Sequence, residues 1–205
     1  MLIVITSEQE IKEEAILLNQ LFEEGLDILH LRKPTFYVND YRELLKKIDS
    51  KFYNRIMIHD CHGLCREFKL KGVHIQEQAR INLENKLQKY VDMWRIKELE
   101  FHSIKYKVSS SFHEPQVLAN CNIDFDYHLL SPVFSSISKV GYEGRGFDVN
   151  SIDKTIIGMG GVNAETIPKV LKLGYKGIGV LGGVWNTENP IESFKAIKKV
   201  YETNN

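Results

Sequence analysis

The stretch IIGMGGVNAETIPKVLKLGYKGIGVLGGVW, residues 156–185, contains the pattern that decides the fold. A short apolar run ends at a glycine pair, a segment with helical spacing follows, and a second short run ends at another glycine pair. This order is typical of two parallel strands joined by a crossover helix, and such connections are right-handed. We therefore expect a parallel sheet if the same alternation recurs elsewhere in the chain.

Strand and helix patterns do alternate along all 205 residues. The predicted strands are 2–6, 26–32, 55–59, 72–75, 104–110, 125–130, 154–159 and 176–182. The predicted helices lie within 8–25, at 37–48, at 64–68, within 83–96, from 114, at 164–174 and at 190–202. Eight such units predict a single (β/α)8 TIM-barrel domain over residues 1–205, in a short version with trimmed helices. An open doubly wound sheet is the alternative, although no Gly-x-Gly-x-x-Gly turn follows the first strand.

Charge balance and cysteine content limit the partners and the compartment that we expect. The 27 lysines and arginines balance 27 aspartates and glutamates, which argues against a nucleic-acid or membrane surface. No apolar run approaches the roughly 20 residues that span a bilayer. The cysteine count is odd and no Cys-x-x-Cys pair occurs, so we expect a reduced, cytoplasmic protein.

The two glycine pairs, 160–161 and 182–183, are candidates for an anion site. Glycine lets the backbone approach a ligand closely, and the loops after strands seven and eight of such barrels commonly bind phosphate. The alternative is that these glycines only permit tight turns.

Charged side chains also follow the second and third strands. His30 and Arg32 are two residues apart and therefore share one face of their strand. A buried arginine needs an anionic partner, which would be a ligand or a nearby carboxylate such as Asp60. Asp60 could instead hold Mg²⁺, or cap the short helix expected near Gly63.

Histidines gather near four strand ends, at His30, His59, His74 and His128. A histidine-bound transition metal is therefore conceivable, although the four residues show no known metal-ligand spacing. The alternative is a set of hydrogen-bonded histidines in the core.

Several motifs, taken in order, resemble the thiamine-phosphate synthase/TenI family over nearly the whole chain. They are LHLRKP (29–34), IHD (58–60), GVHIQEQ (72–78), SPVFSSISK (131–139), GMGGVNAETIPKVLKLG (158–174) and GIGVLGGVW (177–185). The most specific are the Pro-Val-Phe loop that ends in a lysine and the Gly-Gly-Val-Asn turn.

The resemblance implies a reaction and a set of site residues. Synthases of this family join hydroxymethylpyrimidine diphosphate to hydroxyethylthiazole phosphate and release pyrophosphate. By resemblance, Arg32 and Lys139 are catalytic groups that hold the diphosphate, and Asp60 binds Mg²⁺. The substrate-binding residues implied or predicted are His30, His59, Ser110, Ser136, Ser138, Gly161, Leu181 and Gly182. Such chemistry needs positive charge beside the leaving group rather than a nucleophilic side chain.

Three departures from the family pattern keep other functions open. His30 and His59 replace a glutamine and an asparagine, and Gln78 stands where the second metal carboxylate would be. A neutral amide there would weaken Mg²⁺ binding. The alternatives are a thiazole phosphate tautomerase, with His113 beside the aligned Phe112 as general acid/base, or a non-catalytic binder of a phosphorylated thiazole. A homo-oligomer is compatible with each of these functions.

Overall fold

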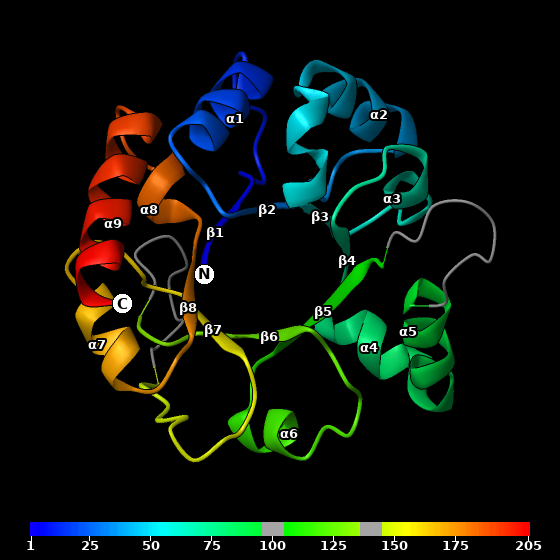
Figure 1. Cartoon of the computed structure of the whole chain (residues 1–205), viewed down its shortest axis with the longest axis vertical. Coiled ribbons are helices and arrows are strands. Elements are labelled where there is room, and N and C mark those ends of the chain that lie inside the picture. Colours follow the sequence, from blue (N-terminus) through cyan, green and yellow to red (C-terminus); the bar gives the residue numbers. More distant parts are fainter. Residues whose placement is uncertain (96–104, 136–144) are drawn as a thin grey trace.

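The computed structural model describes residues 1–95, 105–135 and 145–205, and its strands close into a barrel (Figure 1). Each strand pairs in parallel with the next, and the last pairs with the first. The predicted (β/α)8 barrel is therefore confirmed. The strands are β1 (Leu2–Ile5), β2 (Ile28–Leu31), β3 (Ile56–Ile58), β4 (Gly72–Ile75), β5 (Lys107–Phe112), β6 (Tyr127–Leu130), β7 (Ile156–Met159) and β8 (Gly177–Val180).

Helices form a ring outside the strands. They are α1 (Glu14–Glu23), α2 (Val38–Lys47), α3 (Gly63–Glu67), α4 (Glu77–Leu83), α5 (Leu87–Arg95), α6 (Pro115–Ala119), α7 (Ile167–Lys172), α8 (Gly182–Trp185) and α9 (Pro190–Asn204). Two 3₁₀ turns complete the described elements: η1 (Ser50–Arg55) lies between α2 and β3, and η2 (Glu84–Lys86) lies between α4 and α5. None of the described helices is both long and apolar enough to cross a bilayer.

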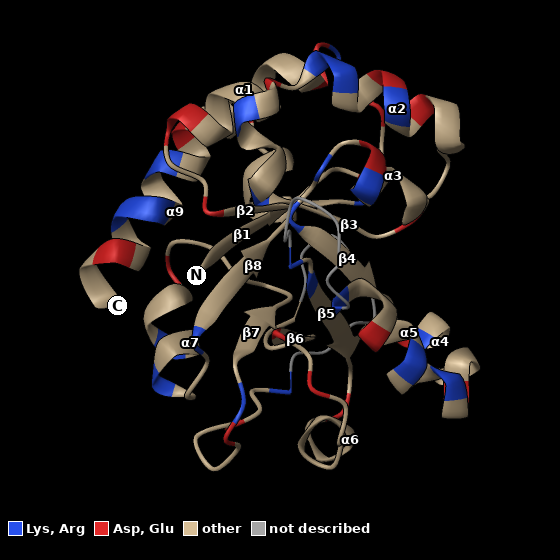
Figure 2. Ribbon diagram, turned by 45° about the vertical axis from the view of Figure 1, so that its right-hand side comes forward, with Lys and Arg blue, Asp and Glu red and all other residues tan. Residues whose placement is uncertain are grey.

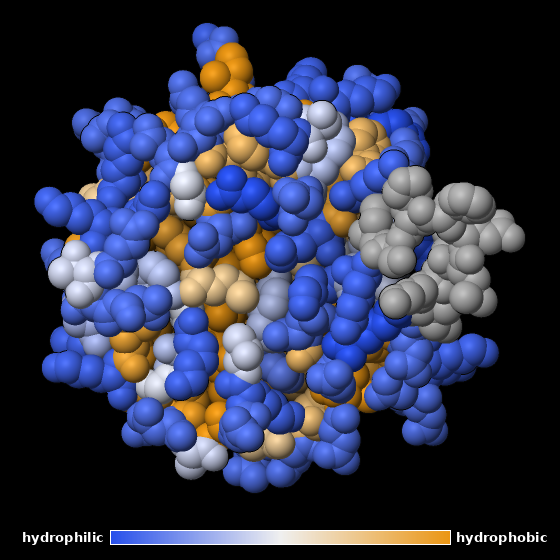
Figure 3. Space-filling view, viewed as in Figure 1, coloured by the Kyte–Doolittle hydropathy of each residue, from blue (hydrophilic) through white to orange (hydrophobic). Residues whose placement is uncertain are grey.

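The surface matches the balanced composition. Acidic and basic residues are interspersed along the outer helices α2 and α9 (Figure 2). Seen down the shortest axis, the molecule is covered mainly by hydrophilic residues, with hydrophobic ones in the hollows between them (Figure 3).

Several boundaries differ from the sequence prediction, including those of the elements around β4 and β5. In place of the single helix expected within 83–96, the chain forms α4 from Glu77, then η2, and then α5 up to Arg95. Strand β5 continues past residue 110 to Phe112, since Ser111 and Phe112 still pair with β6. Serine has little strand preference, and here the sheet contacts override it. Between β6 and β7, no described residue is helical, and residues 136–144 lie outside the described part of the chain.

Alternation along the strands separates two apolar clusters. The larger one fills the space between the strands and the helices. The smaller one lies inside the barrel and consists of Ile3, Ile5, Ile28, Met57, Tyr127, Leu129 and Ile157. Inward positions further along β2 and β3 carry His30 and His59 instead, so the interior changes from apolar to polar toward the carboxyl ends of these strands.

A buried ion pair anchors the segment after β2. The Lys33 side chain is 1% exposed and its Nζ lies 2.7 Å from the Glu14 carboxylate. The same ammonium donates to the carbonyl oxygens of Ser7 (2.9 Å) and Gln9 (2.7 Å). Lys33 therefore fastens the β1–α1 connection to the β2 loop, and its charge is used inside the protein rather than at the barrel mouth.

We expect Lys33→Met to lower the free energy of unfolding by about 3–5 kcal/mol, because it leaves the Glu14 carboxylate buried without its partner. The double variant Lys33→Met/Glu14→Leu should recover most of that loss, since it removes both charges. Urea unfolding of the three proteins measures the difference. A single variant no less stable than the double one would contradict this interpretation.

Candidate active site

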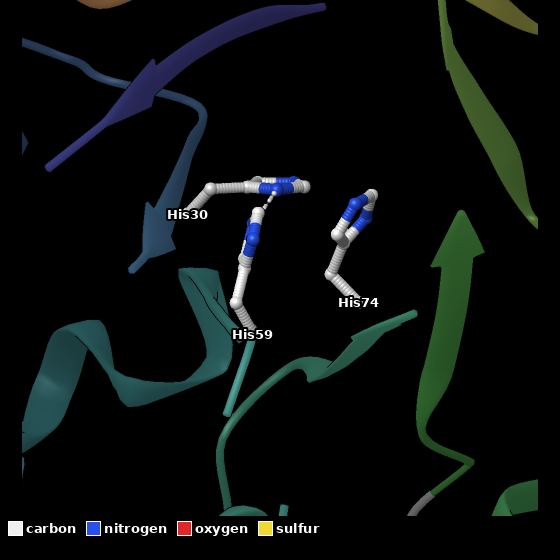
Figure 4. Close-up of side chains that lie close together, drawn as sticks. All are labelled: His30, His59 and His74. Atoms are coloured by element: carbon white, nitrogen blue, oxygen red, sulfur yellow. Dashed lines mark hydrogen bonds between the residues drawn. The ribbon is translucent and has the colours of Figure 1, made fainter. Parts of the chain in front are cut away.

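Three imidazoles from neighbouring strands meet inside the barrel. His30 lies on β2, His59 directly follows β3, and His74 lies on β4. His30 Nδ1 is 2.8 Å from His59 Nε2, and the rings of His59 and His74 stack with their centroids 4.1 Å apart (Figure 4). All three side chains are buried. We call these residues the imidazole layer.

Side chains on β5 and β6 hold two of these rings by hydrogen bonds. His30 Nε2 lies 2.7 Å from the Tyr127 hydroxyl, and His74 Nδ1 lies 2.8 Å from the Ser109 hydroxyl. Each of these two rings is therefore held at one nitrogen, and the other nitrogen of His30 contacts His59.

Burial keeps the layer uncharged near neutral pH. Desolvation lowers the pKa of His30 to about 3. Desolvation, and then the neighbouring histidines, lower the pKa of His59 and of His74 well below the usual value. Neutral imidazoles can accept a hydrogen bond or coordinate a metal, whereas imidazolium ions can do neither.

A second polar group lies beside this layer. Arg32 and Gln76 stand two residues beyond His30 and His74, and Asp60 follows His59. Gln76 accepts from Arg32 Nε at 3.4 Å and donates to the Asp60 carboxylate at 3.1 Å. The polar side chains of β2, β3 and β4 are thus linked across the barrel mouth.

The charged partner of Arg32 is Glu8, in the loop after β1. The sequence suggested Asp60 for this role, but Asp60 accepts from Gln76 and from the Tyr41 hydroxyl at 3.3 Å. Asp60 also does not cap α3, whose capping position is His62 without a side-chain hydrogen bond. The Arg32 side chain is 28% exposed, so its guanidinium remains accessible to an anionic ligand.

The glycine turns after β7 and β8 are packed against their neighbours. Gly160 and Gly161 have positive φ angles of 87° and 64°. A Cβ on Gly161 would lie 2.7 Å from the carbonyl oxygen of Ser135, and one on Gly183 would lie 3.0 Å from that of Val162. The glycines therefore meet the needs of tight turns, and a phosphate site there stays a prediction.

The structure describes only some of the other predicted site residues. Ser110 is fully buried, and its hydroxyl donates to the carbonyl oxygen of Ile75 at 2.7 Å, so it serves the sheet. Leu181 and Gly182 form the turn into α8. The predictions for Ser136, Ser138 and Lys139 fall outside the described residues.

The described residues fit a protein-held Mg²⁺ only in part. Asp60 supplies one carboxylate, and both of its oxygens accept hydrogen bonds. Gln78 is exposed on α4 and donates to Asn82 on the same helix at 2.9 Å, away from Asp60. Mg²⁺ prefers several oxygen ligands, so an ion at Asp60 would depend on oxygens brought by a ligand.

His113 has a carboxylate partner. Its imidazole Nδ1 forms a hydrogen bond with the Glu77 carboxylate, and its backbone N–H donates to the same carboxylate at 3.2 Å. The neighbouring Phe112 is buried, with the Arg80 guanidinium 3.9 Å from its ring centroid. Of these two positions, only His113 can offer a proton to a ligand.

The sequence held a signal for only one of the contacts that it did not predict. Gln76 shares a face with His74 by alternation, so its place beside the imidazole layer could have been found. Glu8 and Tyr41 lie in a loop and on a helix remote in sequence, and no pattern connects them to Arg32 or Asp60.

Comparisons with known proteins agree with this architecture. A family model described as thiamine monophosphate synthase matches residues 2–184. The thiamine phosphate pyrophosphorylase from Bacteroides thetaiotaomicron is 28% identical, with a TM-score of 0.74 over 100% of this chain and 98% of that one. The corresponding enzyme from Pyrococcus furiosus is 18% identical (TM-score 0.75, coverage 98% and 95%), which shows the shared fold. The search of curated proteins found no match. The resemblance seen in the sequence is confirmed.

The buried imidazoles predict acid sensitivity. His30 has a folded-state pKa of about 3, below that of an exposed histidine, so the unfolded chain binds more protons between these values. The contribution of His30 to the free energy of unfolding is therefore fully present above about pH 6.5. It falls by about 1.4 kcal/mol per pH unit as the pH drops toward 3. Urea unfolding from pH 7 to 5 should show this loss, and His30→Gln should reduce its slope. A pH-independent free energy of unfolding would contradict the buried neutral layer.

Proposed function

The chain belongs to the thiamine monophosphate synthase family, and we propose that it joins hydroxymethylpyrimidine diphosphate to hydroxyethylthiazole phosphate with release of pyrophosphate. This reaction makes the protein a transferase in thiamine biosynthesis. Small phosphorylated molecules are its proposed partners.

The position of Arg32 is the observation that carries the proposal. The guanidinium lies just beyond the end of β2 at the barrel mouth, and its exposed Nη1 pairs with an exposed acidic side chain, Glu8. A diphosphate can replace that carboxylate, because it offers the same anionic oxygens with more charge. The exchange leaves the contact between Arg32 and Gln76 in place.

The proposed chemistry assigns roles to these groups. The bond between the pyrimidine methylene and the diphosphate oxygen breaks, and the thiazole nitrogen then forms the new bond to carbon. Arg32 stabilises the negative charge that develops on the departing pyrophosphate. His59 is neutral and its Nδ1 has no hydrogen-bond partner among the described residues, so it would accept a hydrogen bond from the pyrimidine amino group, and His30 would position the His59 ring.

The rest of the predicted site completes this proposal. Lys139 would add a second positive charge on the diphosphate, and Ser136 and Ser138 would contact the thiazole. The turns at Gly161 and at Leu181–Gly182 would bind the thiazole phosphate through backbone N–H groups. We propose Mg²⁺ only as an ion that enters with the diphosphate, and no step depends on it.

We expect Arg32→Ala to lower kcat/KM by about 100-fold or more, because it removes charge stabilisation at the leaving group. Pyrophosphate release from the two substrates measures this. Arg42→Ala is the matched control, since Arg42 is a partly exposed arginine on α2 that pairs with Glu67. No turnover by the wild-type protein, or equal rates for both variants, would refute the proposed function.

The His113–Glu77 pair supports a second candidate, the thiazole phosphate tautomerase. A carboxylate-paired imidazole is suited to move a proton as general acid/base. If this is the activity, His113→Ala should slow tautomer exchange by about 100-fold, whereas Arg32→Ala should have little effect. NMR of the thiazole tautomers measures the exchange. Calorimetric binding of the thiazole phosphate without exchange or pyrophosphate release would indicate a binding protein instead.

A further inference from the structure

The imidazole layer brings three nitrogen ligands to one point inside the barrel. One ring nitrogen from each of His30, His59 and His74 lies within 4.8 Å of the other two. Nitrogens bound to one tetrahedral Zn²⁺ lie about 3.4 Å apart, given Zn–N bonds of about 2.1 Å. Shifts of about an ångström, together with rotation of the stacked rings of His59 and His74, bring the nitrogens to that separation.

The surrounding contacts leave the correct atoms for coordination. Tyr127 and Ser109 engage His30 Nε2 and His74 Nδ1, so His30 Nδ1 and His74 Nε2 remain as ligating atoms. Metal-bound histidines commonly make such a bond with their other nitrogen, which fixes the ring orientation. His59 Nδ1 is buried without a hydrogen-bond partner in the described part of the chain, so no hydrogen bond at that nitrogen opposes a shift of the ring.

The neutral state of the rings also suits a metal. Imidazoles bind metal in their deprotonated form, and burial keeps these three side chains deprotonated at neutral pH. The positive charge of Arg32 acts on His59 and His74 and opposes a cation, and the ion pair between Arg32 and Glu8 offsets part of that charge.

We propose that His30, His59 and His74 form a binding site for one divalent transition-metal ion of the Zn²⁺ or Co²⁺ type. Three imidazole nitrogens and no carboxylate select such a borderline metal over Mg²⁺. Three protein ligands leave a fourth coordination position for a water or a ligand atom. This site is separate from the Mg²⁺ predicted at Asp60, but it shares His30 and His59 with the proposed pyrimidine contacts, so the metal is tested without substrate.

Titration of the metal-free protein with Co²⁺ tests the proposal, because tetrahedral Co²⁺ absorbs strongly in the visible range. We expect one equivalent of Co²⁺ to bind with this spectrum and to be displaced by Zn²⁺. His74→Asn removes one metal ligand and should weaken Co²⁺ binding by about 100-fold or more. His128→Asn is the matched control, because His128 is also buried on a strand but contacts Phe112 and Phe125.

A second measurement on the wild-type protein avoids any folding defect of the variants. Nitrogen NMR of the side chains should show that Zn²⁺ shifts three of the seven histidines, namely those of the imidazole layer. No tetrahedral Co²⁺ spectrum, equal affinity in the His74→Asn and His128→Asn variants, or Zn²⁺ shifts confined to other histidines would overturn the proposal.

Discussion

The pairing of β8 with β1 closes the barrel, and the arrangement of the mouth depends on this closure. Once the ring is closed, alternation along each strand decides which side chains enter the interior. On β8 the inward positions include Gly179, where a Cβ would lie 2.6 Å from Met159 Cγ. The side chain of Met159 occupies this space. Apolar residues thus fill one part of the interior and leave β2, β3 and β4 to supply its polar part.

The polar part is costly to the fold and is held by specific contacts. Buried imidazoles lose hydration, and two of the three recover hydrogen bonds from Tyr127 and Ser109. One nitrogen of His59 recovers none among the described residues. Polar groups kept in a barrel interior at such a cost are characteristic of functional sites rather than of packing. The location of the layer beneath Arg32 agrees with this view.

Much of the fold could be predicted from the sequence, because strand length, glycine turns and helical spacing are local properties. The shared face of His30 and Arg32 and the proximity of His59 to Asp60 also follow from local geometry. The partners of these residues do not. Glu8 reaches Arg32 from a loop, and Lys33 turns inward to Glu14 although it directly follows Arg32 in the sequence. Ser110 resembled a ligand contact in the sequence, but its hydroxyl binds a strand carbonyl, whereas the adjacent Ser109 faces the histidines.

The central claim is that Arg32 exchanges its carboxylate partner for an anionic ligand at the mouth beside the imidazole layer. A crystal structure of the protein with pyrophosphate tests it most directly. We predict that pyrophosphate oxygens contact the Arg32 guanidinium and that Glu8 has moved away. A structure in which pyrophosphate binds elsewhere, while the ion pair between Arg32 and Glu8 persists, would contradict the account.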